Sequence, residues 1–506
     1  MKNIKSWPVI VGASQYTQPK ETKNPLDPLK LIAKVSQLAI KDTEITNIKE
    51  FIDAVYLVHF ASWSYEDAPA ELCKTLGIKP TTKSFSSGGG NTSLRLLNES
   101  ALSITEGKSK FILLTGGETW YSTSLARKGK RVLNWSQPKV SKYTEAGKMK
   151  SLSEFEVKYK LQTPSISFAL LETALRAASG RSLEDHQLSI GRLLEKFSLV
   201  GSNNPFSWLK KPRTAKEIIT PTQINRKVSH PYTKYMCSNP FVDQSGAILL
   251  TSQEFAEELN IKPSKWIYLM GGGNLQNIYN LTQRPSLVNS PAVKHASRLS
   301  LAQAGLKIED IDLFDFYSCF PSMVQLIRNA LKIEEDDPRP LTITGGMAFS
   351  GGPWNNYSLH PVITAVDLIR KNSHLKIMQV ANGGYNTKLS VGIYGKTPPQ
   401  KHWSNDEFLE MQKEILKEEL PKPVDKANGI LTIEAYTIIY KRDGTPEYGV
   451  VLGSLENGSR TLALLKEESI KQHKLSQQEL VGRDFNVYYD DTTGFNYLKI
   501  EVIELT

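Results

Sequence analysis

Residues 86–118 read SSGGGNTSLRLLNESALSITEGKSKFILLTGGE, in which a glycine-rich loop, a helical pattern and an apolar run follow one another. The apolar residues of 94–104 recur at helical spacing, and 111–115 is a run of strand length. Two further strands are predicted upstream, at 9–12 and 51–60. Strands that alternate with helices in this way favour parallel pairs joined by right-handed crossovers, so the predicted fold class is α/β.

The same order of elements returns in the second half of the chain. Residues 306–315 lead into a strand, as residues 44–58 do in the first half. A second glycine-rich loop, 345–352, precedes a helix predicted over 357–371, and a strand at 375–380 follows that helix. Two α/β halves, each with a glycine-rich loop at a helix start, predict a duplicated fold.

Composition bounds the class of protein. The chain has 506 residues, of which 40% are hydrophobic and 23% charged, as in a globular protein of about three domains. No apolar run approaches the ~18 residues of a membrane span, and the apolar stretch 9–11 is too short for a signal peptide. Three cysteines provide neither a disulfide framework nor a zinc-ligand spacing. We therefore expect a cytoplasmic protein with no membrane partner and no bound metal.

The carboxyl-terminal part of the chain has a different pattern. Five apolar–polar alternations, with a helical segment at 466–473 between the third and the fourth, match the layout of an OB-fold barrel. The sequence between the two α/β halves is polar and helical, and is interpreted as an inserted lobe. The predicted domains are the N-terminal half (1–119 and 236–275), the inserted lobe (120–235), the C-terminal half (276–400), a helical linker (401–423) and an OB-like all-β barrel (424–506).

Most of the formal net charge of +10 lies in one segment. Eight basic residues and a single acidic residue, Glu145, fall between Arg127 and Lys150. Such a segment suits the phosphates of a nucleotide, because each cation adds Coulomb attraction and hydrogen-bond donors. The alternative is a solvated, mobile loop, which is what most charge runs are. A nucleic-acid partner is disfavoured, since the rest of the chain has no basic stripe. The candidate phosphate ligands are Arg127, Lys128, Lys130 and Arg131.

Five segments resemble, in order, the active-site loops of the thiolase superfamily, over about residues 5–400. An extra C-terminal domain, together with Asn204-Pro205, Trp208 and Pro231-Tyr232-Thr233-Lys234 of the inserted lobe, makes the chain similar to the type-1 thiolase-like proteins, relatives of the sterol-carrier-protein thiolases. The fold that this resemblance implies is the duplicated, five-layered αβαβα thiolase fold. The five segments are 86–118, 242–247 (VDQSGA), 312–320 (DLFDFYSCF), 345–353 (GGMAFSGGP) and 381–384 (ANGG).

The resemblance also implies where the active site lies. Thiolases accept an acyl group from acyl-CoA on one cysteine and move the α-proton with a second. Those two positions correspond to Gly90 and Ala381 in this chain. The family's Asn and Glu become Tyr317 and Ser318, and the histidine of its Gly-His-Pro loop becomes Gly352. The implied pocket, which could cradle a thioester oxygen, consists of Gly90, Tyr317, Ser318, Gly352, Asn382 and Gly383.

Cys319 and His360 are the remaining catalytic candidates. Cys319 lies in the segment that resembles the His-Asp-Cys-Phe loop of the sterol-carrier-protein thiolases, whose cysteine stands beside the catalytic centre. As a nucleophile it would need a lowered pKa, whereas a buried thiol would be inert. His360 lies two helical turns beyond Gly352, where a satisfied core histidine is the alternative to a catalytic one.

Three functions remain as hypotheses. The first is a divergent acyltransferase of lipid metabolism, similar to acetyl-CoA acetyltransferases, with Cys319 or a bound acyl donor replacing the usual nucleophile. The second is a non-catalytic protein that binds CoA or acyl-CoA. The third is a nucleic-acid-binding protein that uses the OB-like barrel. The first hypothesis gives the class of protein. Without a cysteine at either catalytic position, however, thiolysis and Claisen condensation have no obvious route. CoA or acyl-CoA is the expected substrate or ligand, no cofactor is bound covalently, and the chain is a homodimer or a monomer.

Overall fold

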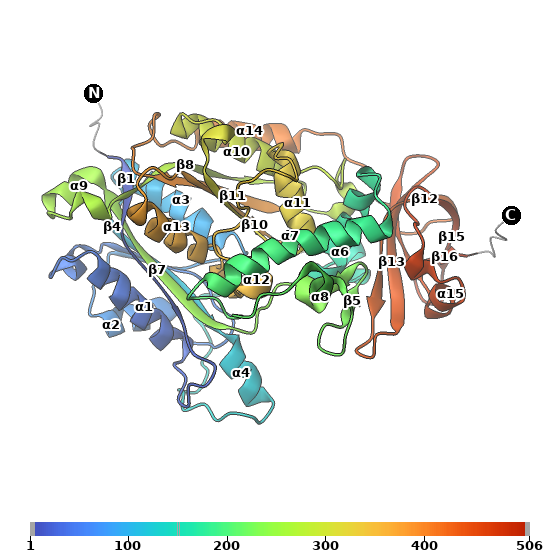
Figure 1. The fold of residues 1–506 in the computed structure, drawn as a ribbon, viewed down its shortest axis with the longest axis horizontal. Helices are drawn as coiled ribbons and strands as arrows, with labels where there is room; N and C mark the ends of the chain where they lie inside the picture. Colours follow the sequence, from blue (N-terminus) through green and yellow to red (C-terminus); the bar gives the residue numbers. More distant parts are fainter. Residues whose placement is uncertain (1–5, 149, 151, 501–506) are drawn as a thin grey trace.

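The computed structural model describes residues 6–148, 150 and 152–500, and a nine-stranded mixed sheet runs through its larger part (Figure 1). The strands lie side by side in the order β3-β2-β4-β7-β1-β8-β11-β10-β9. Their bounds are β1 (Pro8–Thr17), β2 (Ala54–Leu57), β3 (Thr82–Phe85), β4 (Phe111–Thr119), β7 (Asp243–Ser252), β8 (Ile267–Gln276), β9 (Leu313–Phe316), β10 (Ile377–Gly383) and β11 (Lys388–Gly395).

The two halves of the sheet repeat one topology. In the first, β2 is parallel to β4, β4 is antiparallel to β7, and β7 is antiparallel to β1. In the second, β9 is parallel to β10, β10 is antiparallel to β11, and β11 is antiparallel to β8. The duplication predicted from the sequence is confirmed. By this repeat, β8 belongs to the second half of the sheet, whereas the boundary drawn from the sequence left residues up to 275 in the first half.

Helices form the layers around and between these sheets. The middle layer consists of α3 (Thr92–Thr105) and α13 (Leu359–Lys371), each of which contacts β1, β7, β8 and β11, strands of both halves. On the outside, α1 (Pro28–Asp42) and α2 (Ala68–Leu76) cover the first half, and α10 (Pro291–Ala304) covers the second (Figure 1). The five αβαβα layers expected from the thiolase resemblance are present.

Glycine-rich loops place the starts of both middle-layer helices. Gly89, just before α3, has a φ of 151°, and Gly345 and Gly351, before α13, have φ values of 100° and 106°. Residues with a Cβ rarely adopt these conformations. Glycine therefore allows the sharp turns through which the chain enters α3 and α13. The outer helix α1 begins differently: the carboxylate of Asp27 accepts the N–H of Lys30 at 3.0 Å and caps the first turn.

The inserted lobe is mainly helical, as predicted, but it also contains a short hairpin. Strands β5 (Lys227–Ser229) and β6 (Tyr232–Thr233) pair with each other, and β5 pairs with the C-terminal barrel at Ser229–Ile439. Strands of two or three residues are too short for an alternating pattern to reveal them. The helices of the lobe are α4 (Trp120–Arg127), α5 (Glu154–Lys158), α6 (Pro164–Ala178), α7 (Leu183–Asn203) and α8 (Ala215–Ile219).

The C-terminal domain is a closed five-stranded barrel, which confirms the OB-like expectation. The strands close in the order β12-β13-β14-β16-β15, and β15 pairs again with β12. Helix α15 (Glu467–Gln472) lies between the third and fourth strands, where the sequence predicts it. The linker contains α14 (Asp406–Leu416). The barrel strands are β12 (Gly429–Tyr440), β13 (Pro446–Leu455), β14 (Arg460–Leu465), β15 (Asp484–Asp490) and β16 (Phe495–Lys499).

The barrel lies beside the helices of the inserted lobe (Figure 1), and polar contacts fix the two together. The hydroxyl of Thr173 in α6 donates to the carbonyl of Tyr436 at 2.9 Å and accepts the N–H of the same residue at 3.1 Å. Arg176, one turn further along α6, forms an ion pair with Glu479 of the barrel. These contacts make the barrel part of one folded unit. Within the described residues, no helix is both long and apolar enough to cross a membrane.

Candidate functional site

The two glycine-rich loops meet at one end of the middle layer, where Tyr317 fills the space beside Gly90. A Cβ placed on Gly90 would overlap the Tyr317 hydroxyl and lie 2.7 Å from both the Tyr317 Cζ and the carbonyl oxygen of Asn382. Tyr317 is buried, and burial raises the pKa of its hydroxyl well above the usual range, so the phenol is neutral. A cysteine at position 90 could therefore be accommodated only if Tyr317 moved and the backbone at Asn382 shifted.

Residues from the second half hold the loop that precedes α3. The N–H of Gly89 donates to Asn355 Oδ1 at 2.8 Å, and Asn355 Nδ2 donates to the carbonyl of His59 at 3.0 Å. The ammonium of Lys388 donates to the carbonyl of Gly88 at 2.9 Å. Asn355 lies in the short 3-10 helix η6 (Trp354–Asn356), directly after the second glycine-rich loop. The loops of both halves are thus linked by hydrogen bonds, and Asn355 and Lys388 are site residues that sequence reasoning missed.

The backbone amide of Gly352 is already used within the protein. It donates to the carbonyl of Asn239 at 2.9 Å. Gly383 is crowded, because a Cβ there would overlap Asn91 Oδ1. Asn382 is buried, and its Oδ1 has no hydrogen-bond partner among the described residues. Asn382 therefore adds a buried polar atom without a partner among the described residues to the implied pocket.

Ser318 lies in a polar network anchored by a buried carboxylate. Ser318 Oγ accepts the N–H of Met347 at 3.1 Å, which ties the β9 loop to the second glycine-rich loop. At the end of β9, Asp315 accepts the hydroxyls of Thr342 and Thr344 at 3.0 and 2.9 Å. Burial raises the pKa of Asp315 to about 6, against the lowering effect of these hydrogen bonds. Asp315 thus orients the chain that leads into the glycine-rich loop, a role that the sequence did not indicate.

Cys319 has the surroundings of a structural thiol. Cys319 is only 8% exposed, and its backbone carbonyl accepts the N–H of Ser238 at 3.0 Å. Burial raises the pKa of the Cys319 thiol well above its usual range, so the thiolate needed for nucleophilic attack is disfavoured.

His360 joins α13 to β1 through its ring. Its Nδ1 lies 2.9 Å from Gln15 Oε1, and its Nε2 lies 3.4 Å from Asn356 Nδ2. Burial lowers the pKa of His360 to about 4, so the imidazole is neutral at pH 7. These contacts are those expected of a core histidine whose ring nitrogens are both used. Within the described residues, no group of three or more His, Cys, Asp or Glu side chains is placed to hold a metal ion.

The basic segment is held against the first half by its backbone and aromatic side chains. Trp135 Nε1 donates to the carbonyl of Pro25 at 2.7 Å, and the N–H groups of Lys139 and Lys142 donate to Ser64 and Glu66. Further along, the N–H of Gly147 donates to the carbonyl of Ser86 at 3.0 Å. The described part of the segment therefore follows a defined path past the loop that leads to Gly90.

The four candidate phosphate ligands differ in their surroundings. The guanidinium of Arg131 donates to Ser122 Oγ and to the carbonyl of Lys20, both at 2.8 Å. The side chains of Arg127, Lys128 and Lys130 are exposed at the end of α4. The structure thus leaves three of the four exposed to an incoming anion.

Two tryptophans lie beside these cations. Trp354 is 49% exposed, and its ring centroid lies 5.9 Å from that of Trp120. The guanidinium of Arg127 lies over the Trp120 ring at 5.1 Å. Trp354 has a φ of 46°, a left-handed conformation that is strained for a bulky residue, and it immediately precedes Asn355. The exposed indole of Trp354, next to Trp120 and its cation Arg127, therefore adjoins Asn355, the residue that holds Gly89.

This combination of a duplicated five-layered core, glycine-rich loops at both middle-layer helices and a fused barrel defines a thiolase-fold protein. Residues 410–492 match the family described as "Thiolase-like protein type 1 additional C-terminal domain". A comparison with curated protein sequences gave no match. Over its whole length the chain resembles the type-1 thiolase-like proteins, including their additional domain.

Solved structures support this resemblance. A monomeric SCP2-thiolase-like protein type 1 from Mycobacterium smegmatis is 29% identical, with a TM-score of 0.85, and the alignment covers 99% of this chain and 100% of that one. An acetyl-CoA acetyltransferase from Syntrophomonas wolfei is 16% identical, with a TM-score of 0.55 over 77% of this chain and 99% of that one. Human mitochondrial 3-ketoacyl-CoA thiolase, solved in complex with CoA, is 14% identical, with a TM-score of 0.55 over 77% and 98%. The latter two share the fold.

Proposed function

We propose that this protein binds CoA or an acyl-CoA thioester without forming the acyl-enzyme of a thiolase. The observation that carries the proposal is the Tyr317 side chain in the space beside Gly90 that a nucleophilic side chain would need. With no thiolate at this position, a thioester carbonyl has no attacking group next to it. CoA binding does not need a nucleophilic side chain, because a protein can recognise the phosphates and the base of the CoA nucleotide.

The exposed surface around α4 supports the nucleotide part of the proposal. Arg127, Lys128 and Lys130 supply charge-assisted hydrogen bonds to phosphates. A purine base stacks favourably on an exposed indole such as that of Trp354. From there the pantetheine arm would extend toward the loop that Asn355 holds. In this arrangement Arg131 acts as a positioning residue, because it fixes Lys20 and Ser122.

A divergent acyltransferase is the second candidate. The position of Cys319, two residues after Tyr317 in the loop that follows β9, favours it. A reactive Cys319 would require a rearrangement that exposes the thiol and lowers its pKa, since burial raises that pKa. An enzyme of this kind would belong with acetyl-CoA acetyltransferase-like proteins of lipid metabolism.

Intact-protein mass spectrometry and calorimetry together test the proposal. The protein is incubated with acyl-CoAs of several chain lengths, its mass is measured, and CoA binding is measured by titration. We expect CoA to bind and no acyl mass to be added. An acyl adduct that maps to Cys319 and is lost in Cys319→Ala would instead establish the covalent transferase. We call the surface formed by Arg127, Lys128, Lys130 and Trp354 the nucleotide surface. If CoA does not bind at all, both this surface's assignment and the proposed function are wrong.

We further propose that the protein acts as a cytoplasmic monomer. The segment containing Gly147 and Lys148 pairs with the chain just beyond edge strand β3, through Gly147 N–H to Ser86 and Gly88 N–H to Lys148. This pairing lies just past β3, so it shields the end of this sheet edge from a second copy. Analytical ultracentrifugation tests this, and a dimer mass at micromolar concentration would contradict it.

A further inference from the structure

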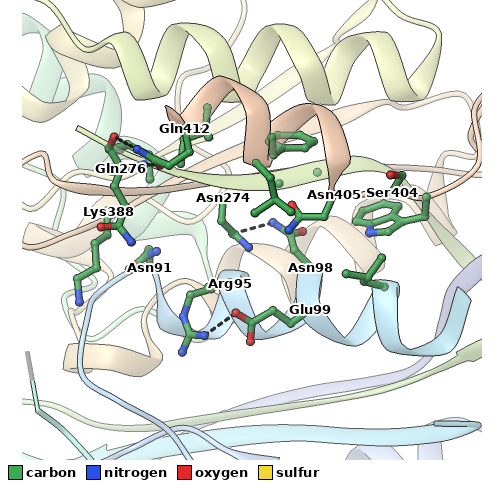
Figure 2. A pocket seen from close by; sticks show the side chains of 18 residues that line it. Asn91, Arg95, Asn98, Glu99, Asn274, Gln276, Lys388, Ser404, Asn405 and Gln412 are labelled. Atoms are coloured by element: carbon green, nitrogen blue, oxygen red, sulfur yellow. Dashed lines mark hydrogen bonds and ion pairs between the residues drawn. The ribbon is translucent and has the colours of Figure 1, made fainter. Parts of the chain in front are cut away.

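A cavity of about 280 Å³, lined by both polar and apolar side chains, lies between α3, the edge of β8 and α14 (Figure 2). Arg95 and Asn98 of α3 line the cavity, together with Asn405, at the N-cap position of α14, and Gln412 of α14 (Figure 2). The volume is near the lower end of the ~300–1,000 Å³ that is usual for small-molecule sites. The volume of the cavity therefore suits a small ligand rather than a CoA molecule.

Two cations line the cavity with a single carboxylate. Lys388 is half-buried, and burial together with the neighbouring charge of Arg95 lowers its pKa. Among the described residues no ion pair includes Lys388; its ammonium donates to the carbonyl of Gly88. Arg95 pairs with Glu99 at 2.6 Å, and the Glu99 side chain is 47% exposed. Lys388 and Arg95 against the single Glu99 leave the cavity with one excess positive charge. Because a half-buried ammonium without a carboxylate partner is costly, an anion bound here would be stabilising.

The edge of β8 adds hydrogen-bonding groups of the backbone. The N–H of Gly272 donates to Gln303 Oε1 at 3.1 Å, and the N–H of Gln276 donates to Gln412 Oε1 at 2.7 Å. Alternate residues of a strand present their backbone groups on the same side. Asn274, midway between these two capped positions, therefore directs its N–H and C=O toward the cavity that it lines.

We propose that this cavity binds a small monocarboxylate that carries an amide or hydroxyl group. The carboxylate lies between Lys388 and Arg95, and the polar group pairs with the backbone of Asn274. A single negative charge matches the excess charge of the cavity. Since Lys388 also holds the carbonyl of Gly88, the bound carboxylate contacts a residue that holds the loop before Gly90.

N-acetylglycine is a suitable probe, because it combines one carboxylate with one amide. Calorimetric titration of the full chain should give a dissociation constant of about 1 mM, and the uncharged N-acetylglycinamide should bind at least about tenfold more weakly. Lys388→Gln and Arg95→Gln should each weaken N-acetylglycine binding by about tenfold or more. Hydrogen exchange should change in the peptides that contain Arg95, Lys388 and Asn405, which locates the site.

Lys396→Gln is the matched control. Lys396 is also half-buried with a pKa lowered by burial, and it donates to the carbonyls of Ser264 and Trp266 at 2.7 and 2.8 Å, outside the cavity. It should bind N-acetylglycine like the wild type. In case Lys388→Gln fails to fold, Asn405→Phe fills the cavity from α14 and should also abolish binding.

Four outcomes would overturn the proposal. One is the absence of binding at millimolar N-acetylglycine. Another is binding that persists in Lys388→Gln, Arg95→Gln and Asn405→Phe. The third is exchange changes confined to other parts of the chain. The fourth is inorganic phosphate binding as tightly as N-acetylglycine with the same dependence on Lys388, which would make this a general anion site. The nucleotide contacts proposed around Trp354 involve none of the residues that line this cavity, so CoA binding measured in Arg95→Gln and Asn405→Phe tests the proposed function separately.

Discussion

The phenol ring of Tyr317 occupies the space beside Gly90, with Cζ 2.7 Å from the point where a Cβ on Gly90 would lie. One residue comes from the first α/β half and the other from the second. A side chain larger than hydrogen at position 90 and an aromatic ring at position 317 therefore exclude each other. The two positions have to be considered as a pair, both for stability and for the chemistry of the site.

Gly90→Cys should accordingly destabilise the protein by about 2 kcal/mol, because the thiol forces Tyr317 out of a well-packed position. Tyr317→Ala alone should cost about 3 kcal/mol through the cavity that it leaves. The double variant should be more stable than the sum of the two effects predicts, since the new thiol uses the vacated space. Chemical denaturation of the four proteins measures this coupling. Additive effects would show that the two side chains do not compete for space.

The nucleotide surface makes a second prediction, about charge. Arg127→Glu, Lys128→Glu and Lys130→Glu together should weaken CoA binding by well over tenfold, and Trp354→Ala should weaken it by roughly tenfold. Lys139→Glu, in the same basic segment, is the control and should change affinity little. Affinity measured at rising salt should fall in the wild type and stay flatter in the triple variant. Unchanged CoA affinity in the triple variant would remove this surface from the proposal.

Substitution of Arg131 should affect stability, unlike substitution of the exposed Arg127, Lys128 and Lys130. Its guanidinium donates to Ser122 Oγ and to the carbonyl of Lys20, so Arg131→Glu breaks two internal hydrogen bonds. We expect this variant to lose about 1–3 kcal/mol of stability, whereas Lys128→Glu should leave the free energy of unfolding nearly unchanged. Denaturation curves of both variants compare them directly. Equal stability would place Arg131 with the exposed cations.

Most of the fold could be predicted from the sequence because it depends on local patterns. Glycine-rich loops followed by helical spacing indicate α3 and α13 correctly, and regular alternation indicates the barrel strands. The hairpin β5–β6 could not be predicted, since its strands are too short to carry a period. The β8 boundary depends on a pairing partner, β11, that lies far along the chain.

The site was harder to predict because its contacts join distant segments. Gly90 and Tyr317 could be aligned with family positions, but nothing in either segment indicates that one fills the space of the other. The basic segment illustrates a second difficulty. It is held through backbone carbonyls such as those of Pro25 and Ser64, and a carbonyl has no residue-type signature. A charge run with these contacts looks like a mobile loop in sequence.

We expect the partly buried ion pair between α6 and the barrel to fix the additional domain. Arg176 is 7% exposed and forms an ion pair with Glu479. Glu479→Gln leaves the guanidinium buried without its countercharge and should cost about 3 kcal/mol. Glu468→Gln, on the exposed side of α15, should cost almost nothing. Urea denaturation with limited proteolysis measures both effects, and equal stability of the two variants would mean that the ion pair does not hold the barrel.

Stability should depend on pH through His360. The pKa of the folded ring is lowered to about 4 from an ordinary value of 6.5, because the ring is buried between α13 and β1. Between these two pH values the unfolded chain binds a proton that the folded ring does not, so the free energy of unfolding falls as the pH falls. Asp315 and Glu118 act in the opposite direction, since burial raises their pKa values to about 6 and 7 and the folded state then binds the extra proton.

The comparison of His360→Gln with the wild type isolates the contribution of the ring from those of the two carboxylates. Between pH 6.5 and 4.5 the wild type should lose about 2 kcal/mol more stability than the variant, since each pKa unit corresponds to ~1.4 kcal/mol. Glutamine can keep the hydrogen bond to Gln15, so the difference reports the proton rather than the packing. His374→Gln, at an exposed position, should give the wild-type slope. Parallel stability curves for wild type and His360→Gln would show that His360 takes up its proton equally in both states, and that the ring is not the buried neutral link between α13 and β1.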